Sequence, residues 1–85
     1  RLEDRRAILQ ASPAIAEVVT LQAVYTGPEE VIVAAKVRPS PSVSADELTN
    51  AIDDLDRQLR EASEFVADVY LDVTKHGRAD VVQSS

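Results

Sequence analysis

The sequence predicts an α+β domain in the order helix, strand, strand, helix, strand, with an open three-stranded mixed sheet that carries both helices on one face. Three observations support this class. A capped amphipathic helix lies in the middle of the chain, runs of alternating β-branched residues flank it, and a Gly-Pro turn separates the first two runs.

The composition is that of one small folded domain. The 85 residues are 45% hydrophobic and 28% charged, so the chain should fold, although around a thin core. Nine basic and fifteen acidic residues give a net charge of -6, which disfavours nucleic acid and anionic membrane surfaces as partners. The chain lacks cysteine, which excludes disulfides and thiolate metal sites.

Two further absences concern the parent protein. No apolar run approaches the roughly 18 to 20 residues that span a bilayer, so we expect no membrane insertion by this segment. The sequence contains no methionine, and we therefore expect it to be part of a longer protein.

The first helix is expected over residues 1–11, with its beginning upstream. Leu2, Ile8 and Leu9 lie among charged residues there, and Ser12-Pro13 should end the helix because proline disfavours helix in the residue before it.

Two strands follow, over residues 17–25 and 31–38. Both alternate at period two, and the turn at 26–30 has the glycine, proline and polar flanks of a short antiparallel connection. Pro39 and Pro41 then end the second strand.

The second helix begins at Ser44, whose spacing to Glu47 is that of a capping box. Asp53 to Arg57 and Asp56 to Arg60 are expected ion pairs on its outer face. Its apolar residues recur at steps of three and four: Leu48, Ala51, Ile52, Leu55, Leu59 and Ala62.

A third strand is expected over residues 65–73, followed by a flexible tail over 74–85, so that the folded domain covers 1–73. A helical crossover favours parallel pairing of strands two and three.

The alternation assigns each strand residue to one face of the sheet. Under the helices we place Val19, Leu21, Ala23, Val31, Val33, Ala35 and Val37. On the other face we place Thr20, Gln22, Ile32, Ala34, Lys36, Asp68, Tyr70 and Asp72. A three-stranded sheet covered on one side is marginal alone, so we expect a homodimer.

The sequence resembles the cytoplasmic C-terminal domain of the cation diffusion facilitators, a family of cation efflux transporters. The likeness covers about Leu2 to Val73 and is carried by a series of segments. These are Ile8-Leu9, Pro13–Val18, Leu21, Gly27–Val37, Ser44, Leu48, Ala51-Ile52, Leu59–Glu61 and Val66–Asp72. The family domain has the same element order, is ferredoxin-like and is similar to a small copper chaperone.

The resemblance implies a function for the parent chain. It would be a cation/proton antiporter that removes zinc, manganese, iron, cobalt or cadmium from the cytoplasm. This domain would then lie on the cytoplasmic side of the cell membrane, attached to the transmembrane domain of the same chain. In the family it dimerises and, in many members, binds a regulatory metal at the interface.

The resemblance also identifies where regulatory metal ligands would lie. Counting from Gly27 and Asp68-Val69, the family's ligand positions hold Val19, Ala35, Asp72 and Thr74 here. In well-known zinc-transporting members of the family these ligands are mainly histidines. Only Asp72 could bind a metal here, so we do not expect that histidine site to form. We assign no catalytic, cofactor-binding or metal residue.

The remaining candidates have simpler interpretations. His76, the one histidine, could join Asp72 in a site shared across a dimer, but it lies in a polar tail beside Lys75 and Arg78. Asp53, Asp54 and Asp56 are expected on a solvated helix face. Ser44 is expected to be a helix cap, and Glu29 and Glu30 are expected to be turn residues. The chain has only two glycines, Gly27 and Gly77, which are too few for a phosphate-binding loop. Tyr25 and Tyr70 are expected to be packing or interface residues.

We therefore expect no enzyme. Two alternatives of the same broad architecture remain. One is a small ferredoxin-like module that senses an effector, although the chain has no glycine-rich loop to hold one. The other is an acylphosphatase-like enzyme, but the arginine and asparagine around a phosphate loop are missing.

Overall fold

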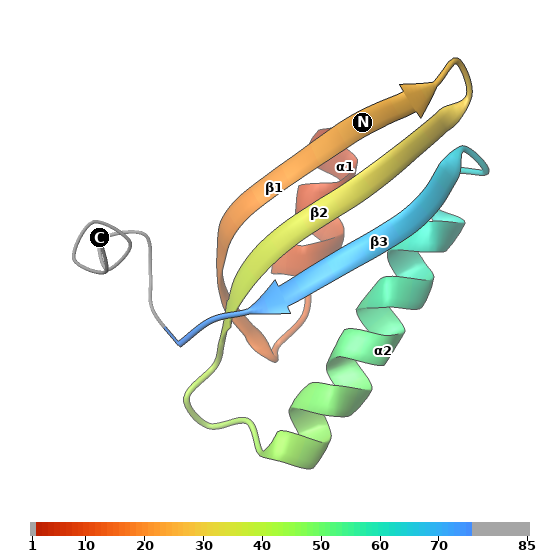
Figure 1. Ribbon diagram of the computed structural model, residues 1–85. Helices are drawn as coiled ribbons and strands as arrows, with labels where there is room; N and C mark the ends of the chain where they lie inside the picture. The colour runs from red at the N-terminus through yellow and green to blue at the C-terminus, as the bar shows by residue number, and fades with distance from the viewer. Residues whose placement is uncertain (1, 76–85) are drawn as a thin grey trace.

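The computed structural model describes residues 2–75, and the side chains of residues 4–75. The elements follow the predicted order: α1 (Leu2–Gln10), β1 (Ile15–Gly27), β2 (Glu30–Pro39), α2 (Ala45–Glu61) and β3 (Val66–Val73). In Figure 1, α1 lies behind the sheet and α2 runs alongside β3. Both helices contribute to one core with the strands, so they cover the same face of the sheet, as the sequence predicts.

The sheet has the strand order β1-β2-β3, with β2 in the centre. β2 pairs antiparallel with β1 and parallel with β3, so the predicted mixed sheet is confirmed. The hairpin is longer than expected. β1 extends from Ile15, opposite Pro39, to Gly27, opposite Glu30, which leaves only Pro28 and Glu29 to make the turn.

A β-bulge in β1 corrects one part of the predicted alternation. Val18 pairs with Val37 but Thr20 pairs with Lys36, so Val19 is an extra residue in the strand. Val18 and Val19 are consequently both buried, with 8% and 2% exposure, whereas strict alternation placed Val18 on the uncovered face. Beyond the bulge the alternation is as predicted.

The capping box of α2 is confirmed. The Ser44 N–H donates to Glu47 Oε1 over 2.8 Å, and the Glu47 N–H donates to Ser44 Oγ over 3.1 Å. These two bonds satisfy backbone donors that the first turn of a helix leaves unpaired. The helix therefore begins where the sequence predicts.

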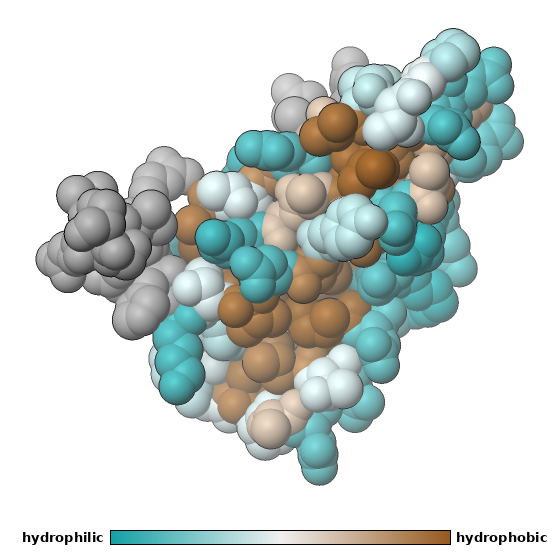
Figure 2. Space-filling model, in the orientation of Figure 1, coloured by the Kyte–Doolittle hydropathy of each residue, from teal (hydrophilic) through white to brown (hydrophobic). Residues whose placement is uncertain are grey.

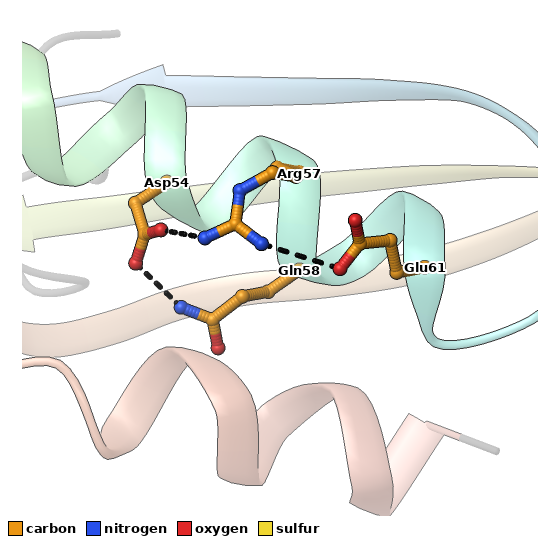
Figure 3. A network of polar contacts seen from close by, with 4 residues as sticks. All are labelled: Asp54, Arg57, Gln58 and Glu61. Atoms are coloured by element: carbon orange, nitrogen blue, oxygen red, sulfur yellow. Dashed lines mark hydrogen bonds and ion pairs between the residues drawn. The ribbon is translucent and has the colours of Figure 1, made fainter.

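One predicted ion pair on α2 is wrong. Arg57 binds Asp54 and Glu61 rather than Asp53, and Gln58 donates to the second oxygen of Asp54 over 2.6 Å (Figure 3). At about 100° per residue, Asp54 and Glu61 lie on one side of Arg57, while Asp53 lies on the other. The Asp56–Arg60 pair is confirmed.

The core lies between the helices and the sheet. It contains Leu9 of α1, Leu55 and Leu59 of α2, and residues of all three strands. The strand residues are Ile15, Val18, Val33, Ala35, Val37 and Val69. Within the described segment, no helix combines the length and apolar character needed to cross a bilayer.

Candidate functional site: the open face of the sheet

The open face is the side of the sheet that no helix covers, and it faces the viewer in Figures 1 and 2. The strand register arranges it in three rows. They are Thr20–Lys36–Asp72, Gln22–Ala34–Tyr70 and Val24–Ile32–Asp68, each with one residue from β1, β2 and β3. We call the first of these the charged row.

Apolar side chains are prominent toward the hairpin end of this face. Tyr70 is 58% exposed and Val24 is 46% exposed, and Ile32 and Ala34 are half-buried. Figure 2 shows apolar surface interleaved with polar side chains across the face. Such exposed apolar area on a small domain is a feature of interaction surfaces.

Asp68 is held by a network that links α2 to β3. Its Oδ1 accepts from the Val69 N–H over 2.8 Å and from Arg60 Nη2 over 2.9 Å, and Arg60 also binds Asp56. The Val69 N–H, then Arg60, then the Tyr70 hydroxyl lower the pKa of Asp68. The same hydrogen bond to Asp68 raises the pKa of Tyr70. The charge of Asp68 is therefore already compensated within the chain.

The charged row is different. Lys36 is half-buried and Asp72 is exposed, and within the described part of the chain neither side chain forms an ion pair. Just beyond them, Arg38 Nε lies 3.1 Å from Glu17 Oε1. Lys36 and Asp72 are thus two opposite charges, side by side on adjacent strands, that have no ion-pair partner among residues 4–75.

The structure does not bring together the four positions that the family resemblance identified. Val19 is 2% exposed and Ala35 is 5% exposed, and Ala35 packs in the core, whereas Asp72 lies on the open face. The β1 and β2 residues that share a row with Asp72 are Thr20 and Lys36, each one position further along the chain. The period-two alternation predicts Lys36 on this face, but its position beside Asp72 follows only from the strand register.

The other candidates lie apart from this face or outside the described residues. His76 and Gly77 are outside them. Among residues 4–75, no three histidine, cysteine or acidic side chains are grouped to hold a metal ion. Asp54 and Asp56 bind arginines on α2, Ser44 caps that helix, and Glu29 and Glu30 are exposed at the hairpin turn.

A groove of about 620 Å³ lies on the helix side, between the end of α1 and α2, which lines it from Glu47 to Gln58. Ile8, Ala11, Val43, Ala51 and Leu55 are among its apolar lining residues, and Glu47, Asp54 and Gln58 add polar groups. Glu47 is engaged in the capping box, and Asp54 binds Arg57 and Gln58.

Comparison with solved structures identifies the fold. The metal-bound C-terminal domain of the CzcD transporter from Thermotoga maritima matches with a TM-score of 0.74 at 12% identity, over 85% of this chain and 83% of that one. A doubly substituted C-terminal domain of MamM matches with a TM-score of 0.72 at 12% identity, over 88% and 90%. A copper form of another MamM variant matches with a TM-score of 0.67 at 13% identity, over 87% and 96%.

These neighbours are C-terminal domains of the transporter family that the sequence resembles, so the resemblance is confirmed at the level of the fold. No family model matches the sequence. No curated protein matches it either.

Proposed function

We propose that this chain is the cytoplasmic dimerisation and regulatory domain of a divalent-cation efflux transporter of the cation diffusion facilitator family. The observation that carries the proposal is the fold match over 85% or more of the chain to C-terminal domains of CzcD and MamM. The series of sequence segments that resemble the same family supports it independently. The ion-translocating residues would lie in the transmembrane domain of the parent chain.

The uncovered sheet face supports the dimerisation part of the proposal. A three-stranded sheet that leaves Tyr70 58% and Val24 46% exposed gains stability from a second surface. Regulation would then operate through the arrangement of the two copies, because a ligand shifts an equilibrium only by its differential affinity for two states.

We propose a divalent cation as the regulator, because the similar solved structures include metal-bound, copper, cadmium and nickel forms. In this chain the four family positions supply one ligand, Asp72, with His76 as a second candidate. A closed structural zinc site takes four ligands. We therefore propose that any metal binding here is weak and requires residues of both copies.

Sedimentation and calorimetry test these two parts separately. The 85-residue chain should sediment as a dimer at high micromolar concentration, and a monomer there would contradict dimerisation. Titration with zinc and with manganese, repeated with Asp72→Ala and His76→Ala, tests the ligands. Binding heat that survives both substitutions would show that other residues hold the metal.

One observation favours the second candidate function, an effector-sensing module. The groove between α1 and α2 is large enough for a small apolar molecule, and its volume falls within the usual range for ligand pockets. Ala51→Trp would fill this groove. If a screen of small apolar acids and amines raised the melting temperature of the chain but not of Ala51→Trp, the effector module would be preferred.

A further inference from the structure

We propose that the charged row joins two copies of this chain through two reciprocal ion pairs, from Lys36 of each copy to Asp72 of the other. The inference rests on the dimerisation proposed above and names the surface and the contact that produce it. The occupant of the open face is thus a second copy of the same chain.

The symmetry of a dimer requires a self-complementary surface. In a two-fold dimer the same patch faces itself, so each residue must suit the residue that the axis places opposite it. Lys36 and Asp72 are partners in the parallel β2–β3 register, which places them on adjacent strands about 4.8 Å apart. A two-fold axis that runs along the strands between β2 and β3 places Lys36 opposite Asp72 of the other copy, twice.

The neighbouring row is compatible with the same axis. Ala34 and Tyr70 are also register partners, so the axis places the small side chain of one copy opposite the large one of the other. Facing sheets pack about 10 Å apart, a distance that opposed lysine and aspartate side chains can bridge. The exposed ring of Tyr70 would then be covered.

The charge distribution favours this pairing over other contacts on the face. Asp68 is bound by Arg60 and the Val69 N–H, and Glu17 is bound by Arg38. Lys36 and Asp72 are the charged side chains of the open face that have no ion pair among the described residues. Since the chain carries a net charge of -6, two copies repel each other unless basic groups lie at the contact.

Exchange of charges between separate chains tests the proposal. Lys36→Glu should leave like charges facing across the axis, and so should Asp72→Lys. Each variant alone should therefore dimerise at least about tenfold more weakly than the unchanged chain. Mixing the two variants should restore a heterodimer, because the glutamate at position 36 then faces a lysine, and Asp72 of one chain faces Lys36 of the other.

The heterodimer separates pairing between chains from pairing within one chain, because an internal Lys36–Asp72 pair is equally absent from both variants whether or not they are mixed. The matched control is Arg6→Glu mixed with Asp53→Lys, which makes the same charge changes at exposed positions on the helices. Neither control variant should lose dimerisation, and their mixture should show no preference for a heterodimer.

Sedimentation velocity and native mass spectrometry of full-length chains give the readout, with circular dichroism to verify folding. If both single variants dimerise like the unchanged chain, or if their mixture stays monomeric, the charged row is not the contact. If the unchanged chain is itself monomeric at high micromolar concentration, the proposed dimerisation fails, and this inference with it.

Discussion

Arg5 is the charged residue that the described part of the chain buries most fully. Its side chain lies on the sheet side of α1, one turn before Leu9, with 6% exposure, and its Nε is buried without a hydrogen-bond partner in the segment that the structure describes. A buried donor that lacks a partner destabilises the folded state.

Arg5→Met should therefore raise the free energy of unfolding, by about 1 kcal/mol, because methionine keeps the apolar stem and removes the unpaired donor. Urea denaturation measures the change. Arg6→Met is the control: Arg6 is exposed on the same helix, and its replacement should change stability by less than about 0.5 kcal/mol. If Arg5→Met instead lowers the free energy of unfolding, the Arg5 guanidinium makes a contact that stabilises the fold by more than its burial destabilises it.

Ser44 is the residue on which the start of α2 depends. Ser44→Ala removes the hydroxyl that accepts from the Glu47 N–H, and should lower the free energy of unfolding by about 1 kcal/mol. Thermal and urea unfolding of Ser44→Ala and Ser42→Ala make a matched comparison, since Ser42 is exposed and precedes the helix. Equal stability of the two variants would argue that the cap contributes nothing.

At the scale of elements, the ion pair between Arg60 of α2 and Asp68 of β3 links the helix to the strand. The pKa of Asp68 is lowered by the Val69 N–H first and by Arg60 second, and the pKa of Glu47 is lowered by its hydrogen bonds to Ser44. A carboxylate whose pKa is lowered on folding stabilises the fold above its unfolded pKa of about 4, and this stabilisation is lost as the pH falls through the folded value.

Stability should therefore decline below about pH 4. Asp68→Asn cannot lose a charge and should show a smaller decline than the unchanged chain. Urea midpoints measured from about pH 7 to about pH 2.5 test this. Asp53→Asn, a change at an exposed residue without an ion pair in the described segment, should retain the full decline. If Asp68→Asn loses stability as steeply as the unchanged chain, the Asp68 network does not contribute to the acid response.

Most of the elements could be predicted because their signals are local. The capping box at Ser44, the turn at Gly27-Pro28 and the period-two alternation each depend on a few consecutive residues. The bulge at Val19 could not be predicted, because it shows only when the register against β2 places Thr20 opposite Lys36. The predicted ion pair of Arg57 with Asp53 was wrong, because Asp53 and Asp54 are both within reach of Arg57 on a helix. The position of each aspartate around the helix axis decides which one binds.

The candidate site was harder to predict than the fold. Counting along the sequence placed Val19 and Ala35 with Asp72, although both are buried away from it. The residues that accompany Asp72 are Lys36 and Thr20, and only the pairing of three strands shows this. A row across a sheet combines residues that are far apart in sequence, and one extra residue in one strand shifts every member on that strand.

At the scale of the whole molecule, dimerisation would make stability depend on concentration. If the folded dimer is the more stable form, the thermal midpoint should rise with protein concentration, because association binds folded copies and not unfolded ones. The rise should be smaller at high salt, where the proposed Lys36–Asp72 pairs are screened. Calorimetry at about ten and about five hundred micromolar tests this, and a midpoint independent of concentration would contradict it.

The parallel attachment of β3 also has a consequence for how the domain opens. β1 and β2 are joined by a tight hairpin, but β3 reaches β2 only after the 17 residues of α2. Among residues 2–75, no strand pairs with the other edge of β3. We therefore expect β3 and α2 to detach as one unit before the hairpin melts, and their amide protons to exchange with solvent sooner. Since β3 carries Asp72, a second copy bound to the open face would slow that exchange, and the strand that opens most readily would be the one that association holds in place.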